Sequence, residues 1–360
     1  MKSRETKVES RGRKVHTPLK TPRPAVRVVP DKLRAGDEIR ILALSRSIGG
    51  LKQYPGISDA DVEFARKRLE ALGLRVSFGR HVMETNAHLT ISVESRLEDL
   101  RDALNDASVK GILAVTGGIG AIQLLNRLDF ALFAAHPKIL CGYSDMSFLC
   151  NAIYARTGVV TYYGPHFSTF MMQKGFDYTL RNFQACLFDP APFDAVASPE
   201  WSDDLWIKDQ ENRRFFPNRG WWGIHDGEVE GIVLGGDFFP INLLQGSEFF
   251  PPLDEGILFL EHPSKGKSTL MNLDMGLRAL TYQPHFRKVR AIVIGRFAGN
   301  AGIDRNRMSA MINDIPELAR MPVIANCDFG HTAPIMTLPI GGRCRIKVSG
   351  GETQITMLTH

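Results

Sequence analysis

The sequence lacks several features that would define its class at once. No stretch approaches the roughly 18 to 20 consecutive apolar residues that a membrane-spanning helix needs. Residues 1–30 hold no apolar core of the kind found in a secretory signal. The five cysteines lie mostly in apolar runs and form no C-x-x-C pair, so neither a disulfide framework nor a thiolate metal site is expected. We therefore expect a cytoplasmic protein without a membrane partner.

Positive charge is concentrated at one end of the chain. Residues 1–30 carry nine Lys and Arg against two Glu, a net charge of +7, which leaves −2 for the rest of a chain whose total is +5. The same segment has four prolines and few apolar residues, which predicts a disordered basic arm. The arm could touch nucleic acid or a membrane surface weakly, but because the remaining chain is nearly neutral, nucleic acid is not an expected partner.

Strand-like and helix-like patterns alternate from residue 37 to residue 163. Buried strands are predicted at residues 39–44, 74–78, 110–115, 139–141 and 159–163. Helices are predicted at residues 59–72 and 92–105, from about residue 121, and after residue 144. Alternation with short connections forces right-handed crossovers and a mostly parallel sheet covered by helices, as in flavodoxin-like and Rossmann-like folds. Sites in such sheets lie at the carboxyl ends of the strands.

The second half of the chain has a different pattern. At 360 residues the chain is longer than one core supports, so two domains are expected. After about residue 170 the sequence becomes aromatic-rich and loop-like, and then short strands are predicted from residue 230 on. We predict a second, β-rich α/β domain with a barrel-like character. The predicted division is an arm at 1–30, an α/β domain at 31–185, a Trp-rich linker at 186–229 and a C-terminal domain at 230–360.

The tetrapeptide Gly142–Asp145 presents a serine between an apolar run and a helix-like run. At such a strand-to-helix turn the Ser144 hydroxyl stands clear of the sheet, next to the first N–H groups of the helix. Ser144 is therefore a candidate nucleophile. The alternative is that Ser144 or Asp145 merely caps the helix.

A serine nucleophile needs a base, and the base needs a carboxylate that fixes its tautomer. Glu261 closes the apolar strand at 256–261, and His331 follows the glycine turn of Asp328–Thr332. Either could instead be an ordinary ion-pairing or hydrogen-bonded residue. His166, just past Gly164-Pro165, is the strongest rival histidine and a candidate pocket residue.

The pair Gly117-Gly118 follows the predicted strand at 110–115 and exposes backbone N–H groups. The N–H of Gly118 and that of Asp145 are candidate donors to an oxyanion. The glycines could equally serve only a tight turn, whereas a phosphate cradle is weakly supported because no P-loop lysine follows them.

Together these motifs resemble the LD-carboxypeptidases, serine peptidases of bacterial cell-wall peptides, a family that also includes the microcin C immunity proteins. The resemblance runs from Gly36 to Gly342 and includes Gly117-Gly118, the Gly142–Asp145 turn, Gly164-Pro165, Gly235-Gly236, the strand ending at Glu261, and Gly330-His331. It implies Ser144 as the nucleophile, with Glu261 and His331 completing a triad. It also implies an N-terminal α/β domain, a barrel-like C-terminal domain, a cleft between them, and commonly a homodimer.

This chain departs from the cell-wall members at a few positions. Many of them have an arginine before the first glycine pair, a proline within A-P-S and an asparagine after the second glycine pair, where this chain has Thr116, Leu44 and Asp237. All four tryptophans fall between residues 201 and 222, a segment similar to the immunity-protein branch. Their indoles could stack on a base or form an interdomain or dimer patch. The residues expected to contact substrate are Gly117, Tyr143, His166, Trp206, Trp221 and Trp222.

These observations lead to one main hypothesis and two alternatives. The chain is expected to hydrolyse an amide bond with a Ser-His-Glu triad and without metal or cofactor. Its substrate would be either an L,D cell-wall peptide or a microcin-type aminoacyl-nucleotide. One alternative is a non-catalytic protein that binds a peptide or nucleotide in the same cleft. The other is a metal-assisted hydrolase built on His166, Glu261, His262 and His331, which would leave Ser144 without a role.

Overall fold

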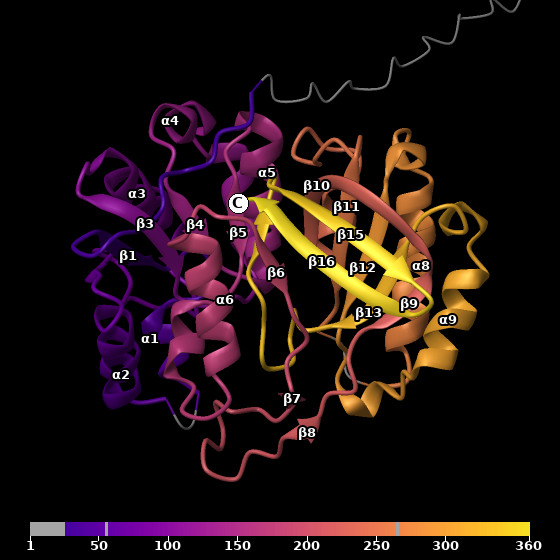
Figure 1. Ribbon diagram of the computed structural model, residues 1–360. Helices are drawn as coiled ribbons and strands as arrows, with labels where there is room; N and C mark the ends of the chain where they lie inside the picture. The colour runs from indigo at the N-terminus through magenta and orange to yellow at the C-terminus, as the bar shows by residue number, and fades with distance from the viewer. Residues whose placement is uncertain (1–25, 55–56, 264–265) are drawn as a thin grey trace, which may run out of the picture.

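The computed structural model describes residues 26–54, 57–263 and 266–360. All but the last five residues of the predicted basic arm, 1–30, lie outside the described residues. Among the described residues, no helix has both the length and the apolar character that crossing a membrane requires. The fold has two main sheets, drawn mostly from the first and the second half of the chain (Figure 1).

The first sheet has six strands in the order β14-β5-β4-β3-β1-β2, all parallel except β14. Its strands are β1 (Glu38–Leu42), β2 (Arg75–Phe78), β3 (Val109–Ala114), β4 (Ile139–Cys141), β5 (Thr161–Tyr163) and β14 (Leu338–Ile340). The helices of this half are α1 (Ile48–Leu51), α2 (Asp59–Glu70), α3 (Val93–Asn105), α4 (Phe130–Ala135), α5 (Ser147–Thr157) and α6 (Asp177–Leu187). Neighbouring strand residues such as Ile41 and Leu42 enter separate buried clusters, because successive side chains point to opposite, covered faces.

The second sheet has eight strands in the order β6-β16-β15-β10-β11-β12-β13-β9, of which β10 to β13 are parallel. Its strands are β6 (Phe193–Ala195), β9 (Trp222–His225), β10 (Gly227–Asp237), β11 (Gly256–Glu261), β12 (Ala291–Gly295), β13 (Val323–Cys327), β15 (Arg343–Ser349) and β16 (Glu352–Thr359). The edge strand β9 also lies against β15 and β16, so the sheet curls towards a barrel. A Cβ built on Gly223 of β9 would come within 2.7 Å of a Val348 methyl group in β15, which shows how closely the strands approach. The predicted pairing of a parallel-rich α/β half with a β-rich, barrel-like half is confirmed.

The α/β character predicted for the second half implied helices, but their positions were not predicted from the sequence. The parallel strands β10 to β13 are connected by α7 (Phe238–Leu244), α8 (Thr269–Thr281) and α9 (Arg305–Asn313). Helix α6 likewise occupies part of the stretch after residue 170 that was predicted to be loop-like, and a short strand pair, β7 (Glu200–Trp201) and β8 (Phe216–Pro217), follows it. The short length of α7 and its internal Pro240 explain why its pattern was hard to recognise.

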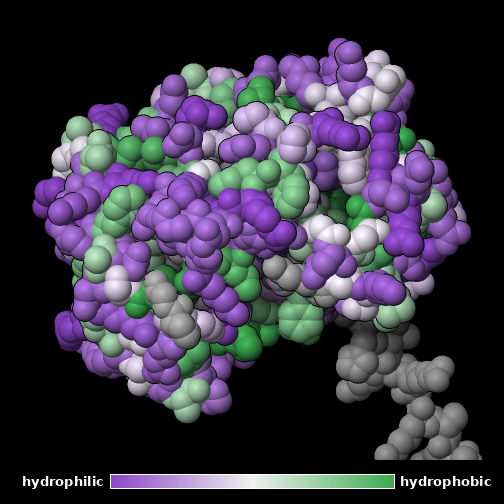
Figure 2. All heavy atoms as spheres, turned by 90° about the horizontal axis from the view of Figure 1, so that it is seen from below, coloured by the Kyte–Doolittle hydropathy of each residue, from purple (hydrophilic) through white to green (hydrophobic). Residues whose placement is uncertain are grey.

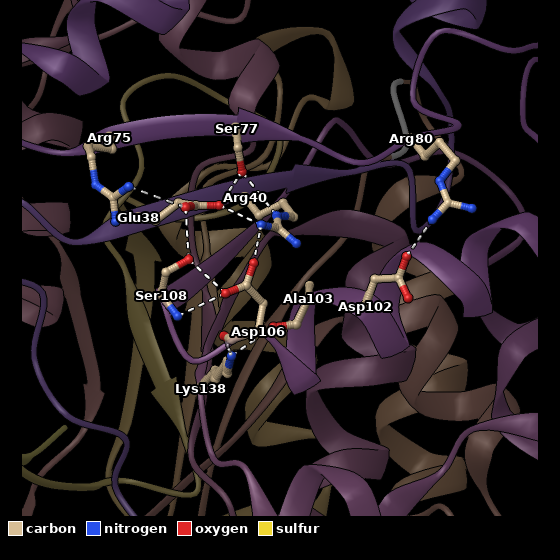
Figure 3. Close-up of polar contacts among 10 residues, drawn as sticks. All are labelled: Glu38, Arg40, Arg75, Ser77, Arg80, Asp102, Ala103, Asp106, Ser108 and Lys138. Carbon is tan, nitrogen blue, oxygen red and sulfur yellow. Dashed lines mark hydrogen bonds and ion pairs between the residues drawn. The ribbon is translucent and has the colours of Figure 1, made fainter.

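A polar network joins the amino ends of the four parallel strands β1 to β4 (Figure 3). Arg40 Nη2 donates to Glu38 Oε1 and to Asp106 Oδ2, each at 2.7 Å. Lys138, directly before β4, is buried and donates from Nζ to the Ala103 carbonyl at 2.7 Å, near the end of α3. Desolvation lowers the pKa of Lys138 to about 8. The network closes the sheet at the edge opposite the carboxyl ends of the strands, where the candidate site lies.

The two halves are joined at more than one place. Strand β14, which falls within the predicted C-terminal segment 230–360, pairs with β5 of the first sheet. Helix α5 packs against β10, where the buried Asn151 donates from Nδ2 to the Gly235 carbonyl at 2.7 Å and accepts the Gly235 N–H at 3.1 Å.

The surface is mostly hydrophilic on the face seen from below, with smaller groups of apolar side chains among the polar ones (Figure 2).

The Asn151 contact predicts a large effect of one substitution. In Asn151→Ala both backbone groups of Gly235 lose their partner in a buried environment, which should lower the free energy of unfolding by about 2 to 4 kcal/mol. Urea unfolding followed by circular dichroism measures this change. In the control Asn182→Ala, the lost amide donates to Tyr178 O of its own helix, and the cost should stay below about 1.5 kcal/mol. Equal effects of the two variants would contradict the interpretation.

Candidate active site

Ser144 lies at the carboxyl end of β4, in a 3₁₀ turn that leads into α5. Its backbone has a φ of +61°, a left-handed conformation that is unusual for a residue other than glycine. Such strain is kept only where the surroundings fix it, and it is typical of functional turns. The Ser144 N–H donates to the Tyr163 hydroxyl at 3.1 Å, which helps to hold this conformation.

Ser144, His331 and Glu261, named from the sequence, are brought together in one hydrogen-bonded chain. Ser144 Oγ lies 2.9 Å from His331 Nε2, and His331 Nδ1 lies 2.9 Å from Glu261 Oε2 and 3.1 Å from Oε1. Because Nδ1 faces a carboxylate, it carries the proton of a neutral imidazole. Nε2 is then free to accept the serine hydroxyl.

Two different strands of the second sheet position the histidine and the glutamate. Glu261 is the last residue of β11 and is completely buried, while His331 follows β13. Gly330 allows their approach, since a Cβ at this position would lie 2.5 Å from Glu261 Oε2. Gly330 also has a φ of +107°, which a side chain would disfavour.

Tyr163, the last residue of β5, is a member of the site that the sequence reasoning missed. Its buried hydroxyl donates to Glu261 Oε1 at 2.5 Å and accepts the Ser144 N–H. Burial raises the pKa of Tyr163, so the hydroxyl stays protonated and able to donate. Its position at a carboxyl strand end, just before Gly164-Pro165, was the available signal.

The glycine loop after β3 packs directly on the serine. A Cβ on Gly117 would lie 2.9 Å from Ser144 Cβ and 3.1 Å from Oγ. The Asp145 carboxylate accepts from Ser45 Oγ at 2.5 Å and from the Ala121 N–H at 2.9 Å, which ties the loop to the serine turn. Gly118 and Asp145, the predicted oxyanion donors, line the same pocket as Ser144. Their role as donors stays a prediction.

Ser144 opens into a pocket of about 510 Å³. Of the residues predicted to contact substrate, Gly117, Tyr143 and His166 line it. The buried His166 ring stacks on Tyr143 with centroids 4.1 Å apart, and Nε2 lies 2.8 Å from the Tyr143 carbonyl oxygen. Desolvation lowers the pKa of His166 to about 3, so this ring is neutral at pH 7. His166 is thus placed as a structural wall of the pocket.

Asp237 and His262 also line the pocket, and Asp237 had been noted only as a departure from the family pattern. Asp237 ends β10 and is buried, and its desolvation raises the pKa of its carboxyl group. Ligand atoms of Asp237, Glu261 and His331 lie within 4.8 Å of one another, the spacing of a possible metal site. Both Glu261 oxygens already bond to His331 or Tyr163, so an ion would have to break these contacts. The donor set fits the triad arrangement better than metal binding.

The predicted tryptophans are spread over different surroundings. Trp206 borders a small cavity of about 40 Å³ together with Tyr143 and His331. Trp221 is only 9% exposed and donates from Nε1 to Asp328 Oδ2 at 2.8 Å, while Trp222 lies in β9 opposite Ala325. Neither of them lines the Ser144 pocket within the described part of the chain. Their predicted contact with substrate is therefore not supported by their placement.

Asp328 explains why the tryptophan-rich segment folds in this way. Its buried carboxylate accepts from the Ser198 N–H at 3.0 Å, from Trp221, and from Arg296 Nη2 at 2.5 Å. Asp328 precedes His331 by three residues, so this segment is fastened to the base of the histidine loop. The tryptophan spacing therefore reflects packing at least in part.

Family profiles, related sequences and solved structures all point to the same protein family. Residues 39–164 match the profile of the LD-carboxypeptidase N-terminal domain, and residues 230–346 match that of the C-terminal domain. The putative carboxypeptidase YocD of Bacillus subtilis (strain 168) is 46% identical over 91% of this chain and 99% of its own length. The microcin C7 self-immunity protein MccF of Escherichia coli is 28% identical over 82% of this chain and 86% of its own. The crystal structure of an MccF-like protein from Bacillus anthracis str. Ames superposes with a TM-score of 0.89 and 45% identity, covering 92% of this chain and all of that one.

The pKa of His166 predicts a pH dependence of stability. The unfolded chain binds a proton at this histidine below about pH 6.5, whereas the folded protein does so only near pH 3. The contribution of neutral His166 to the free energy of unfolding is therefore fully present above pH 6.5. Below that pH it falls by up to about 1.4 kcal/mol per pH unit. Unfolding by urea between about pH 4 and pH 7 should show a shallower slope for His166→Gln than for wild type. Identical slopes would contradict a buried neutral His166.

Proposed function

The chain belongs to the LD-carboxypeptidase family, and from this premise we propose that it hydrolyses an amide bond with Ser144 as the nucleophile. The observation that carries the proposal is the chain of contacts Ser144 Oγ to His331 Nε2 to Glu261, at 2.9 Å each. Serine is a weak nucleophile until an adjacent base takes its proton. This arrangement provides that base in the correct tautomer.

In the proposed first step, His331 Nε2 takes the hydroxyl proton while Ser144 Oγ attacks the substrate carbonyl carbon. The negative charge that develops on the carbonyl oxygen is stabilised by the N–H groups of Gly118 and Asp145. Glu261 stabilises the imidazolium, and Tyr163 holds the carboxylate in place through its hydroxyl. His331 then returns the proton to the leaving nitrogen as the C–N bond breaks.

The second step regenerates the enzyme. The acyl group is now an ester of Ser144, and water attacks this ester with His331 as the general base. The acid product leaves and the proton returns to Ser144 Oγ. All the protons that move are carried by Ser144, His331 and water, so no cofactor is required by this route.

Two substrate classes are compatible with the family. An L,D cell-wall peptide with a free carboxylate agrees with the carboxypeptidase names of its relatives. A microcin-type aminoacyl-nucleotide agrees with the similarity to MccF and with Thr116 in place of the arginine of many cell-wall members. Trp206, close to Tyr143 and His331, is the remaining tryptophan that could contact such a substrate. A homodimer also stays a prediction from the family.

Product analysis by mass spectrometry tests the proposal. Wild type and Ser144→Ala are incubated with a muramoyl tetrapeptide and with an aminoacyl-adenosine phosphoramidate. Loss of the nucleophile should lower turnover by roughly four to six orders of magnitude. The matched control Ser95→Ala, on α3 and outside the pocket, should keep wild-type turnover.

The outcomes separate the two functional classes. Equal turnover by wild type and Ser144→Ala would exclude Ser144 as the nucleophile. Binding of either compound without turnover by wild type would favour the non-catalytic binding protein on this fold.

A second prediction concerns the glycine that faces the nucleophile. In Gly117→Ala the new methyl group would lie 2.9 Å from Ser144 Cβ and 3.1 Å from Oγ, so Ser144 must shift from the position in which Oγ contacts His331. A displacement of this kind should lower kcat by roughly 100-fold or more. In the control Gly299→Ala the nearest atoms would be 3.7 Å away, and kcat should be unchanged. Unchanged kcat for Gly117→Ala would show that Ser144 does not need its observed position.

A further inference from the structure

The pocket beside Ser144 contains an arginine that the triad does not use. Arg46 follows β1 and lines the pocket together with Thr116 and Gly118. The backbone of Arg46 pairs with that of Thr90 and of Thr116 in single antiparallel β-bridges, so it is fixed next to the glycine loop. Its guanidinium lies 5.6 Å from the centre of the Tyr54 ring, which supports its orientation without neutralising its charge.

Among the described residues, no acidic side chain pairs with the guanidinium of Arg46. No acidic side chain in the described ranges 26–54, 57–263 and 266–360 lies within 4.0 Å of its guanidinium nitrogens. Arg96, the other arginine near the loop, differs in this respect. It is buried, and its donors are used by the Gly120 carbonyl at 2.9 Å and by Gln123 at 2.5 Å. Arg46 is therefore the arginine of this pair with donors available for a ligand.

Arg46 and Ser144 both pack against the glycine pair Gly117-Gly118. A Cβ on Gly118 would lie 2.6 Å from Arg46 Cγ and 3.0 Å from Nε, whereas one on Gly117 would lie 3.1 Å from Ser144 Oγ. The two side chains thus flank one dipeptide, whose Cα atoms are about 3.8 Å apart. Arg46 and Ser144 line the same pocket, so a substrate whose carbonyl lies at Ser144 can extend along the glycine pair towards the guanidinium.

We propose that Arg46 binds an anionic group of the substrate, a carboxylate or a phosphate next to the scissile amide, and so determines specificity. The inference rests on the proposed function. Arginine is suited to this task because its planar fork of donors matches both anions. Arg46, bridged to Thr116 next to the glycine loop, places a positive charge on this side of the pocket.

Kinetics with charged and neutral versions of one substrate test the role of Arg46. The muramoyl tetrapeptide is compared with its C-terminal amide, and an aminoacyl-adenosine phosphoramidate is compared with the neutral carboxamide of the same aminoacyl group. Arg46→Gln should lower kcat/KM about 10- to 100-fold for the anionic compound that wild type cleaves, and less than about 3-fold for its neutral counterpart. Which anionic compound loses activity identifies the source of the anion.

Three further variants separate recognition from structure. Arg46→Lys should keep part of the preference for the anion, because it keeps the charge without the fork. The double variant Arg46→Gln/Thr116→Arg should recover part of the lost kcat/KM. Arg127→Gln removes a guanidinium that pairs with Glu94 outside the pocket. It should leave kcat/KM unchanged for both the anionic compound and its neutral counterpart.

An equal loss on charged and neutral compounds, or no loss on the charged one, would overturn the role of Arg46 while leaving the triad intact. If wild type cleaves none of the compounds, the proposed function fails instead. Calorimetry with Ser144→Ala then still decides the question for Arg46. Equal affinities for the peptide acid and its amide would overturn the proposal, whereas a preference for the acid that Arg46→Gln abolishes would support it.

Discussion

The geometry of the site depends on the docking of α5 onto β10, because the serine and its base come from different sheets. Asn151 bonds both backbone groups of Gly235, and Ser147 Oγ accepts the Asp237 N–H at 2.8 Å. Gly236 leaves no room for a side chain here, since its Cβ would lie 2.6 Å from Ser147 Oγ. A shift at this seam of a fraction of an ångström would lengthen the Ser144 to His331 contact. The second glycine pair is thus a requirement of packing as much as of local backbone conformation.

A buried carboxylate next to the nucleophile would be costly if it stood alone. Glu261 is completely buried, yet its oxygens accept from Tyr163 and from His331. Neutral donors reduce the desolvation penalty without fixing a full positive charge beside the imidazole. The carboxylate is then most strongly stabilised when His331 becomes protonated during the reaction. Tyr163 links this electrostatic arrangement to the strained serine turn through the Ser144 N–H.

Much of the fold and the central part of the site were accessible from the sequence. The apolar runs that end at Cys141 and Glu261, and the glycine turn before His331, mark strand ends, and the resemblance connected the three residues. Tyr163 and Arg46 were missed because their roles depend on contacts between segments far apart in the chain. For the tryptophans the sequence left stacking and packing open, and Trp221 is used by Asp328 in packing. Helices α7 and α9 span only seven and nine residues, so they show too few turns for a clear periodic pattern. Helices α6 and α8 are as long as helices that were predicted, and their pattern was not recognised.

Covalent labelling by a fluorophosphonate tests the central claim most directly, since such reagents form a stable bond with an activated serine. Peptide mapping by mass spectrometry would locate the label in wild type and in His331→Gln. A single label at Ser144 that is strongly reduced in His331→Gln is the result that this account predicts. Labelling of another residue, or equal labelling of Ser144 without His331, would contradict it.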